Sequence, residues 1–232
     1  MRSGATARGP ARPAEAMGPS PERISALVDA EQRSLEEIHT SRELGLASCR
    51  KVIQLAGRSI RAVHRLERSK AESLAGEAET ALRSAQGDLG RHEAMARATF
   101  LHDAEKEYAE ARLTYQLTGG SELASASELG VGGPAWLNGL AEAASELRRH
   151  LLDRLRSGEL EAAESLFGSM DAVYDALSCV DLPEAVTGGL RRRIDALRAV
   201  LERSRADLTT TLTQARLEVA LRAGMGSGSP PT

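Results

Sequence analysis

Two pairs of glutamates are the residues of this 232-residue chain whose type and spacing could do chemistry. Glu107 and Glu110 lie three residues apart, and Glu142 and Glu146 lie four apart. Because side chains three or four residues apart share a face of a helix, each pair would point its carboxylates in one direction. Two such faces brought together would collect four mutually repelling carboxylates, and a divalent cation with oxygen ligands is the usual solution. We therefore predict a metal site.

A pair of glutamates on a helix more often forms a solvated face than a metal site. The residues beside these glutamates help to decide between the two. They are mostly small or apolar: Ala104, Tyr108, Ala109 and Ala111 beside the first pair, and Leu140, Ala143, Ala144 and Leu147 beside the second. Carboxylates in such surroundings would be half-buried, and half-buried carboxylates need a partner. The neighbours thus favour the functional interpretation.

The donor types select the metal and the chemistry. A di-iron bundle needs Glu-x-x-His pairs on two helices, and the sequence does not supply two. Zinc prefers Cys or His ligands at short spacing, which are also missing. An all-oxygen set suits Mg²⁺ or Mn²⁺. Such an ion activates water and stabilises charge on a phosphate, so phosphodiester cleavage is the reaction we expect.

A stripe of arginines is the second feature with chemical meaning. Arg58, Arg61, Arg65 and Arg68 recur at helical spacing. From Ser41 to Lys70 the chain has eight basic residues and two acidic ones, whereas from Ala71 to Glu110 it has four basic and nine acidic. The stripe either contacts phosphates or forms a solvated face that pairs with acidic helices, and the spacing alone leaves both interpretations open.

Composition indicates the fold class that must position these residues. The chain is 41% hydrophobic and 27% charged but only 3% aromatic, which favours helices packed through aliphatic side chains. Apolar residues recur every three or four positions, and no strand or hairpin signal is present. We therefore predict an all-α single domain of six or seven helices.

The helices are expected in particular ranges. The first begins at Ser20 or Ser25 and buries a stripe of Ile24, Leu27, Val28, Leu35 and Ile38. Further helices are expected at about 41–73, 74–89, 92–117, 134–157, 159–178 and 189–220, with a loop over 119–133 that contains at most one short turn. Residues 1–20 are predicted to be a disordered extension, 21–222 the helical domain and 223–232 a flexible tail.

Location and membrane association follow from simpler signals. No run of eighteen apolar residues is present, so no membrane span is expected. The first twenty residues lack the hydrophobic segment of a secretory signal. Cys49 and Cys179 lie far apart in helical patterns, which favours buried thiols over a disulfide. We expect a cytoplasmic protein.

Four motifs in order resemble one family. They are His92–Ala111 with its Glu-Tyr-x-Glu-Ala core, Leu137–Arg149, Gly158–Tyr174 and Gly189–Asp195. Together they resemble the translin/TRAX family, in particular its prokaryotic single-gene members, over about residues 22–218.

The resemblance implies a subunit of about seven helices that assembles into a ring- or barrel-like homo-oligomer, typically an octamer. Family members bind single-stranded RNA or DNA, and the TRAX-type subunit is a metal-dependent endoribonuclease. Glu107 and Glu110 match its first two catalytic acids, Glu142 stands where the family usually has Asp, and Glu146 matches the next Glu. Because the translin-type subunit lacks the full acidic set, this chain looks TRAX-like.

The function expected from sequence is therefore Mg²⁺- or Mn²⁺-dependent cleavage of single-stranded RNA by the four glutamates. The arginine stripe would hold phosphates, with His92 and Arg97 as weaker contacts. The runner-up is a nucleic-acid-binding oligomer without catalysis, and a third alternative is a purely structural helical protein. Few aromatics argue against base stacking, so binding should be led by the backbone and depend on salt.

Overall fold

The computed structural model describes residues 20–96 and 98–226, and the chain divides into two units between Thr40 and Ser41. Residues 20–40 belong to the N-terminal part of helix α1 (Pro21–His64). The predicted burial of their apolar stripe is wrong for four of its five residues, because Ile24, Leu27, Val28 and Leu35 are each about half exposed or more. The fifth, Ile38, is partly buried. The described residues of this unit form a lone helical segment, which offers its apolar stripe no second apolar surface.

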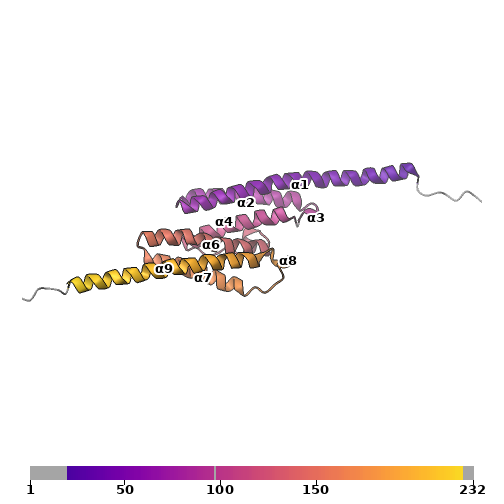
Figure 1. Cartoon of the computed structure of the whole chain (residues 1–232). Coiled ribbons are helices and arrows are strands. Elements are labelled where there is room, and N and C mark those ends of the chain that lie inside the picture. The colour runs from indigo at the N-terminus through magenta and orange to yellow at the C-terminus, as the bar shows by residue number, and fades with distance from the viewer. Residues whose placement is uncertain (1–19, 97, 227–232) are drawn as a thin grey trace, which may run out of the picture. The chain divides into compact units, whose positions relative to one another are not determined.

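In the unit that begins at Ser41 the described residues form helices joined by turns and loops, with no strand, which confirms the all-α prediction (Figure 1). It contains the rest of α1, followed by α2 (Arg68–Leu89), α3 (Glu93–Ala96), α4 (Thr99–Gly119), α5 (Ala126–Leu129), α6 (Gly133–Arg156), α7 (Leu160–Ser178), α8 (Glu184–Thr187) and α9 (Leu190–Gly226). Helices α3, α5 and α8 are single turns, and the longer helices form the bundle.

Helix α1 ends earlier than the expected helix over 41–73. It stops at His64, and Leu66 takes a positive φ of 61° in the turn before α2. The Ser59 hydroxyl donates a hydrogen bond of 2.8 Å to the carbonyl of Ala71, which fastens α1 to the first turn of α2. The arginine stripe therefore does not follow one helix, because Arg65 lies in the turn and Arg68 begins α2.

Two further boundaries concern the acidic helix and the loop after it. The single helix expected over 92–117 is instead two, since Ala98 is extended before α4 begins at Thr99. The expected loop with one short turn is confirmed, because α5 is that turn and Ser125 caps it with Glu128. The predicted 1–20 extension and 223–232 tail fall mainly on residues outside the described ranges.

The centre of the bundle is α6, which packs against α4, α7 and α9. Helices α4 and α6 approach closely where Gly139 of α6 meets Ala109 of α4, and Ala109 is fully buried. A Cβ atom added to Gly139 would lie only 2.9 Å from the backbone oxygen of Lys106 and the backbone nitrogen of Glu110. This close approach sets the acidic faces of α4 and α6 against each other.

Candidate metal centre and nucleic-acid interface

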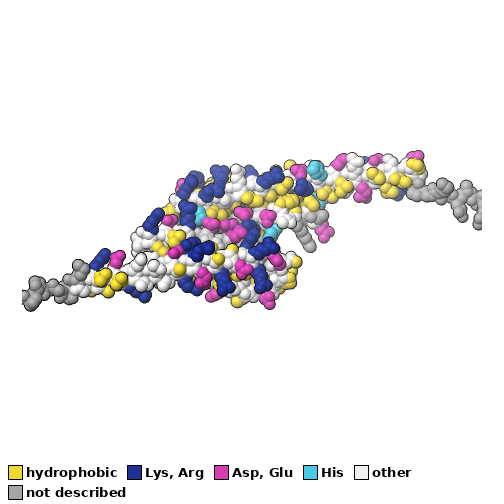
Figure 2. All heavy atoms as spheres, in the orientation of Figure 1, with side chains coloured by type: hydrophobic (Ala, Val, Ile, Leu, Met, Phe, Trp, Pro, Cys, Tyr) yellow, Lys and Arg dark blue, Asp and Glu magenta, His cyan; other side chains and the backbone are white. Residues whose placement is uncertain are grey.

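Three of the four predicted metal ligands lie together. Carboxylate oxygens of Glu107 and Glu110, from α4, and of Glu142, from α6, all lie within 4.8 Å of one another. Acidic side chains gather over α4 in the space-filling view (Figure 2). An all-oxygen group of this size could hold a hard divalent cation.

Glu110 is the buried member of this acidic cluster, which we define as Glu107, Glu110 and Glu142. Its side chain is buried, with the residue only 8% exposed. Burial, followed by the charges of Glu142 and Glu107, raises the pKa of Glu110 to about 9. At neutral pH its carboxyl group is therefore protonated unless a cation compensates the charge of the ionised form.

Two cationic side chains of the chain itself reach the cluster. The Lys106 ammonium donates hydrogen bonds to Glu142 Oε2 at 2.6 Å and to Glu107 Oε1 at 2.9 Å. Burial lowers the pKa of Lys106, but the hydrogen bonds to Glu107 and Glu142 outweigh burial and raise it above its ordinary value. On the other side of Glu142, Arg193 Nε from α9 lies 3.3 Å from Oε1.

Glu146 lies one turn beyond Glu142 and has a different partner. Its Oε2 is 2.6 Å from Nε2 of His64, and Nδ1 of His64 is 3.2 Å from Nε2 of His150. The structure thus places the fourth predicted acid beside the cluster, in a chain of contacts Glu146–His64–His150. Burial, and then the neighbouring His64, lowers the pKa of His150. No local sequence pattern connects these three residues.

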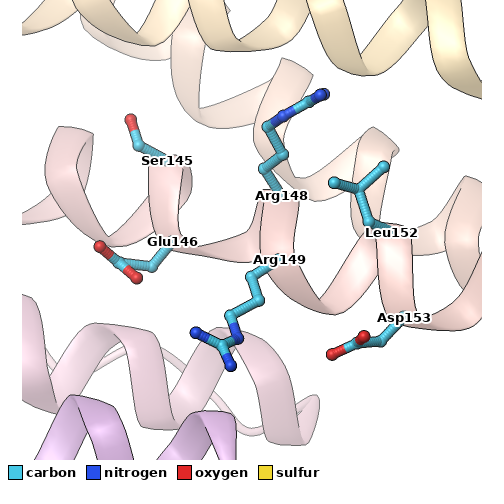
Figure 3. Close-up of a pocket in the computed structure, with 6 residues that line it drawn as sticks. All are labelled: Ser145, Glu146, Arg148, Arg149, Leu152 and Asp153. Carbon is cyan, nitrogen blue, oxygen red and sulfur yellow. The ribbon is translucent and has the colours of Figure 1, made fainter.

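An open groove on α6 continues from Glu146. Its volume is about 380 Å³, and it is lined by Ser145, Glu146, Arg148, Arg149, Leu152 and Asp153 (Figure 3). Arg148 is held by Asp207 at 2.7 Å. Arg149 is exposed, has no hydrogen bond or ion pair with any described residue, and points to the same side of α6 as Glu146 in Figure 3. The pattern Glu-x-x-Arg could have indicated it.

The residues predicted to contact phosphates differ in whether other side chains already bind them. Arg58, Arg61 and Arg65 are exposed and make no hydrogen bond or ion pair with the described part of the chain. Arg68 instead stacks 3.9 Å from the centre of the Tyr115 ring and donates a 3.0 Å hydrogen bond to the Tyr115 carbonyl. His92 lies 3.2 Å from the Ser41 hydroxyl.

Arg97, the last of the predicted contacts, lies outside the described residues. None of the helices in the described ranges is both long and apolar enough to cross a membrane.

Comparisons with known proteins identify the fold. No protein-family model matches the chain. A stretch of 124 residues is 28% identical to an uncharacterized protein of Methanocaldococcus jannaschii, and it spans 53% of this chain and 55% of that protein, about half of each.

The solved structures cover much more of the chain. The crystal structure of AfC3PO is similar at a TM-score of 0.74 with 26% identity, over 82% of this chain and 98% of AfC3PO. The AfC3PO–duplex RNA complex is similar at a TM-score of 0.65 with 29% identity and the same coverage. The apo-NeC3PO structure, 18% identical over 79% of this chain and 96% of its own length, shares the fold at a TM-score of 0.71.

The helical bundle is therefore the translin/C3PO fold, which the motifs predicted. The two AfC3PO structures, at 26% and 29% identity, support the assignment of this chain as a prokaryotic translin-like protein. The apo-NeC3PO structure, at 18% identity, supports the fold alone.

Proposed function

We propose that this chain binds single-stranded RNA and cleaves it with a divalent cation, Mg²⁺ or Mn²⁺, held by the acidic cluster. The observation that carries the proposal is the convergence of three carboxylates from two helices in this fold. A similar protein, AfC3PO, has been solved with duplex RNA, which supports nucleic-acid binding by the fold.

The cluster fits such an ion on chemical grounds. Its donors are carboxylate oxygens, which hard cations prefer, and the buried carboxyl of Glu110 ionises only with a compensating charge nearby. A bound divalent cation would supply Lewis acidity toward the scissile phosphate and the attacking water. Glu146, which is hydrogen-bonded to His64, remains the proposed fourth acid and would accept a proton beside the cluster.

Exposed arginines supply the proposed phosphate contacts. Arg58, Arg61, Arg65 and Arg149 are each exposed and uncommitted to an acid among the described residues. Guanidinium groups bind phosphates through paired N–H donors, and each neutralised phosphate adds to the salt dependence of binding. Arg68 is excluded from this group because Tyr115 already engages it.

The test is a ribonuclease assay on three purified proteins: the parent, Glu110→Gln and Glu77→Gln. Glu77 is an exposed acid on α2 without a partner among the described residues, so it is the matched control. We expect cleavage by the parent and Glu77→Gln that requires Mg²⁺ or Mn²⁺ and stops with a chelator, and loss of cleavage in Glu110→Gln. Equal cleavage by all three without metal would indicate a contaminating nuclease and contradict the proposal.

A second candidate function is RNA binding without catalysis. The observation that favours it is the pair of cations, Lys106 and Arg193, that already neutralise Glu107 and Glu142. It predicts salt-dependent RNA binding that survives Glu110→Gln, with no metal-dependent cleavage by the parent.

We further propose a homo-oligomer, an octamer by the family resemblance. Apolar side chains that stay exposed among the described residues support it, at Ile24, Leu27 and Leu35 in α1 and at Leu217 and Leu221 in α9. Light scattering on the full chain should give the mass of several subunits, and a monomer would contradict this. Both cysteines are free thiols, but only Cys49 is buried, as expected, whereas Cys179 is exposed. Free thiols suit the proposed cytoplasmic location.

A further inference from the structure

Lys106 places an ammonium group within the acidic cluster. The residue is only 7% exposed, although lysine side chains usually extend into water. Its Nζ hydrogen-bonds carboxylates of both helices, Glu107 on α4 and Glu142 on α6. Only three of the 30 basic residues in the chain are lysines. A lysine in this position is therefore a specific feature of the site.

The ammonium engages the oxygens that a cation would need. A metal ion that uses Glu107, Glu110 and Glu142 together requires Glu107 and Glu142 to turn toward it, and both now accept hydrogen bonds from Lys106. An ion and an ammonium that draw on the same two carboxylates repel each other at this range. Ion and ammonium therefore compete for Glu107 and Glu142.

We propose that Lys106 is a built-in competitor of the divalent cation, which enters the acidic cluster only by displacing the Lys106 ammonium, and that the displaced ammonium then contacts a phosphate of the bound nucleic acid. This inference rests on the proposed function, because it concerns the same cluster. It adds a regulatory counter-ion and a substrate contact to that site.

The chemistry of lysine suits this exchange. Its ammonium is a compact charge on a flexible four-carbon stem, whereas arginine would hold a carboxylate through a rigid, two-pronged contact. Glu107 and Glu142 retain 27% and 28% side-chain exposure, so the Lys106 side of the cluster reaches solvent. The carboxylates that hold the ammonium therefore border solvent, where a displaced ammonium could meet a phosphate.

The experiment measures Mn²⁺ affinity of the metal-free full-length protein by calorimetry. Lys106→Met and Lys106→Gln remove the competing charge, and Lys70→Met, an exposed lysine paired with Glu67, removes a distant one. We expect both Lys106 variants to bind Mn²⁺ at least about tenfold more tightly than the parent, the effect of removing a charge at hydrogen-bond distance. Lys70→Met should match the parent, and Lys106→Arg should bind no more tightly than the parent.

Thermal unfolding gives a readout that does not depend on activity. Without metal, Lys106→Met should unfold at a lower temperature than the parent, because the carboxylates lose their counter-ion. Mn²⁺ should raise its unfolding temperature by more than it raises that of the parent, since tighter binding to the folded state stabilises it more.

The outcomes separate the two proposals. In one outcome, Glu110→Gln weakens Mn²⁺ binding, but the parent and the folded Lys106→Met and Lys106→Gln variants bind Mn²⁺ equally well. This result would overturn the role of Lys106 and leave the metal site intact. Mn²⁺ affinity that Glu110→Gln does not weaken, or no affinity at all, would overturn the metal site and the Lys106 proposal together.

The phosphate contact has its own test. With saturating Mn²⁺, binding of a single-stranded DNA oligonucleotide should depend more steeply on salt in the parent than in Lys106→Met, by about 0.7 in the slope of log affinity against log salt for one added contact. Without Mn²⁺ the two slopes should agree, because the ammonium stays in the cluster. Equal slopes in both conditions would overturn this part of the proposal.

Discussion

Gly139 is the residue whose substitution tests how α4 and α6 assemble the site. An alanine Cβ there would lie 2.9 Å from Ala109 Cβ, Glu110 N and Lys106 O. Two of these three atoms belong to the backbone of α4, which cannot turn aside as a flexible side chain can. Gly139→Ala must therefore push the two helices apart at the level of Glu110.

The expected magnitude has two opposing parts. Overpacking a tight contact costs about 1–3 kcal/mol, whereas replacing a helical glycine by alanine stabilises by about 1 kcal/mol. Gly168 in α7 is the matched control, because nothing lies within 4 Å of its added Cβ and only the stabilising part applies. The two variants should thus differ by about 1–3 kcal/mol in the free energy of unfolding, with Gly168→Ala the more stable.

Calorimetric unfolding and Mn²⁺ titration measure both consequences. At about 2–4 °C per kcal/mol for a domain of this size, the unfolding temperatures should differ by roughly 2–12 °C. Gly139→Ala should also bind Mn²⁺ more weakly than Gly168→Ala, because the carboxylates of Glu107 and Glu110 move away from Glu142. If Gly139→Ala is as stable as Gly168→Ala and binds Mn²⁺ equally, the close approach does not position the site.

Three further predictions concern ionisation and side-chain contacts. Because the pKa of Glu110 is raised to about 9, Mn²⁺ should release a proton on binding, and calorimetry should show Mn²⁺ affinity rising by about tenfold per pH unit toward pH 9. The stability of the metal-free protein should fall as pH rises from about 4.5 to about 9. A pH-independent affinity would contradict the first expectation, and a pH-independent stability the second. His64→Ala should cost about 1–3 kcal/mol in urea unfolding, because buried hydrogen bonds are lost, and no loss would show that this cluster of contacts is unimportant for stability. Arg68→Ala should lower the free energy of unfolding by about 1–2 kcal/mol, because its contacts with Tyr115 are lost. Arg61→Ala should change the free energy of unfolding by less than about 0.5 kcal/mol and weaken RNA binding. The reverse pattern would contradict the roles assigned to these two arginines.

Helix class and the identity of the acidic helices were predictable because they depend on local spacing. Small apolar residues between acids indicate a packed helix, and the Glu107–Glu110 and Glu142 faces do meet. The end of α1 was not predictable by the same means, since the turn contains neither glycine nor proline and instead places Leu66 at positive φ. Only tertiary packing selects that conformation.

The detailed partners of the acids were beyond sequence spacing for a similar reason. His64 and Glu146 lie 82 positions apart, so no local pattern connects them. Lys106 precedes Glu107 directly and would project from a different part of the helix surface, but its long stem turns toward both acids. The exposed stripe of residues 20–40 has the spacing of a buried one, and spacing alone does not indicate which surface covers it.

The central claim is that the acidic cluster holds a hard divalent cation, and anomalous scattering tests it most directly. Crystals of the full-length protein soaked in Mn²⁺ should show one strong anomalous difference peak contacted by oxygens of Glu107, Glu110 and Glu142, with the Lys106 ammonium displaced. No peak at this cluster in crystals that contain saturating Mn²⁺, with Lys106 still bound to Glu107 and Glu142, would contradict the account.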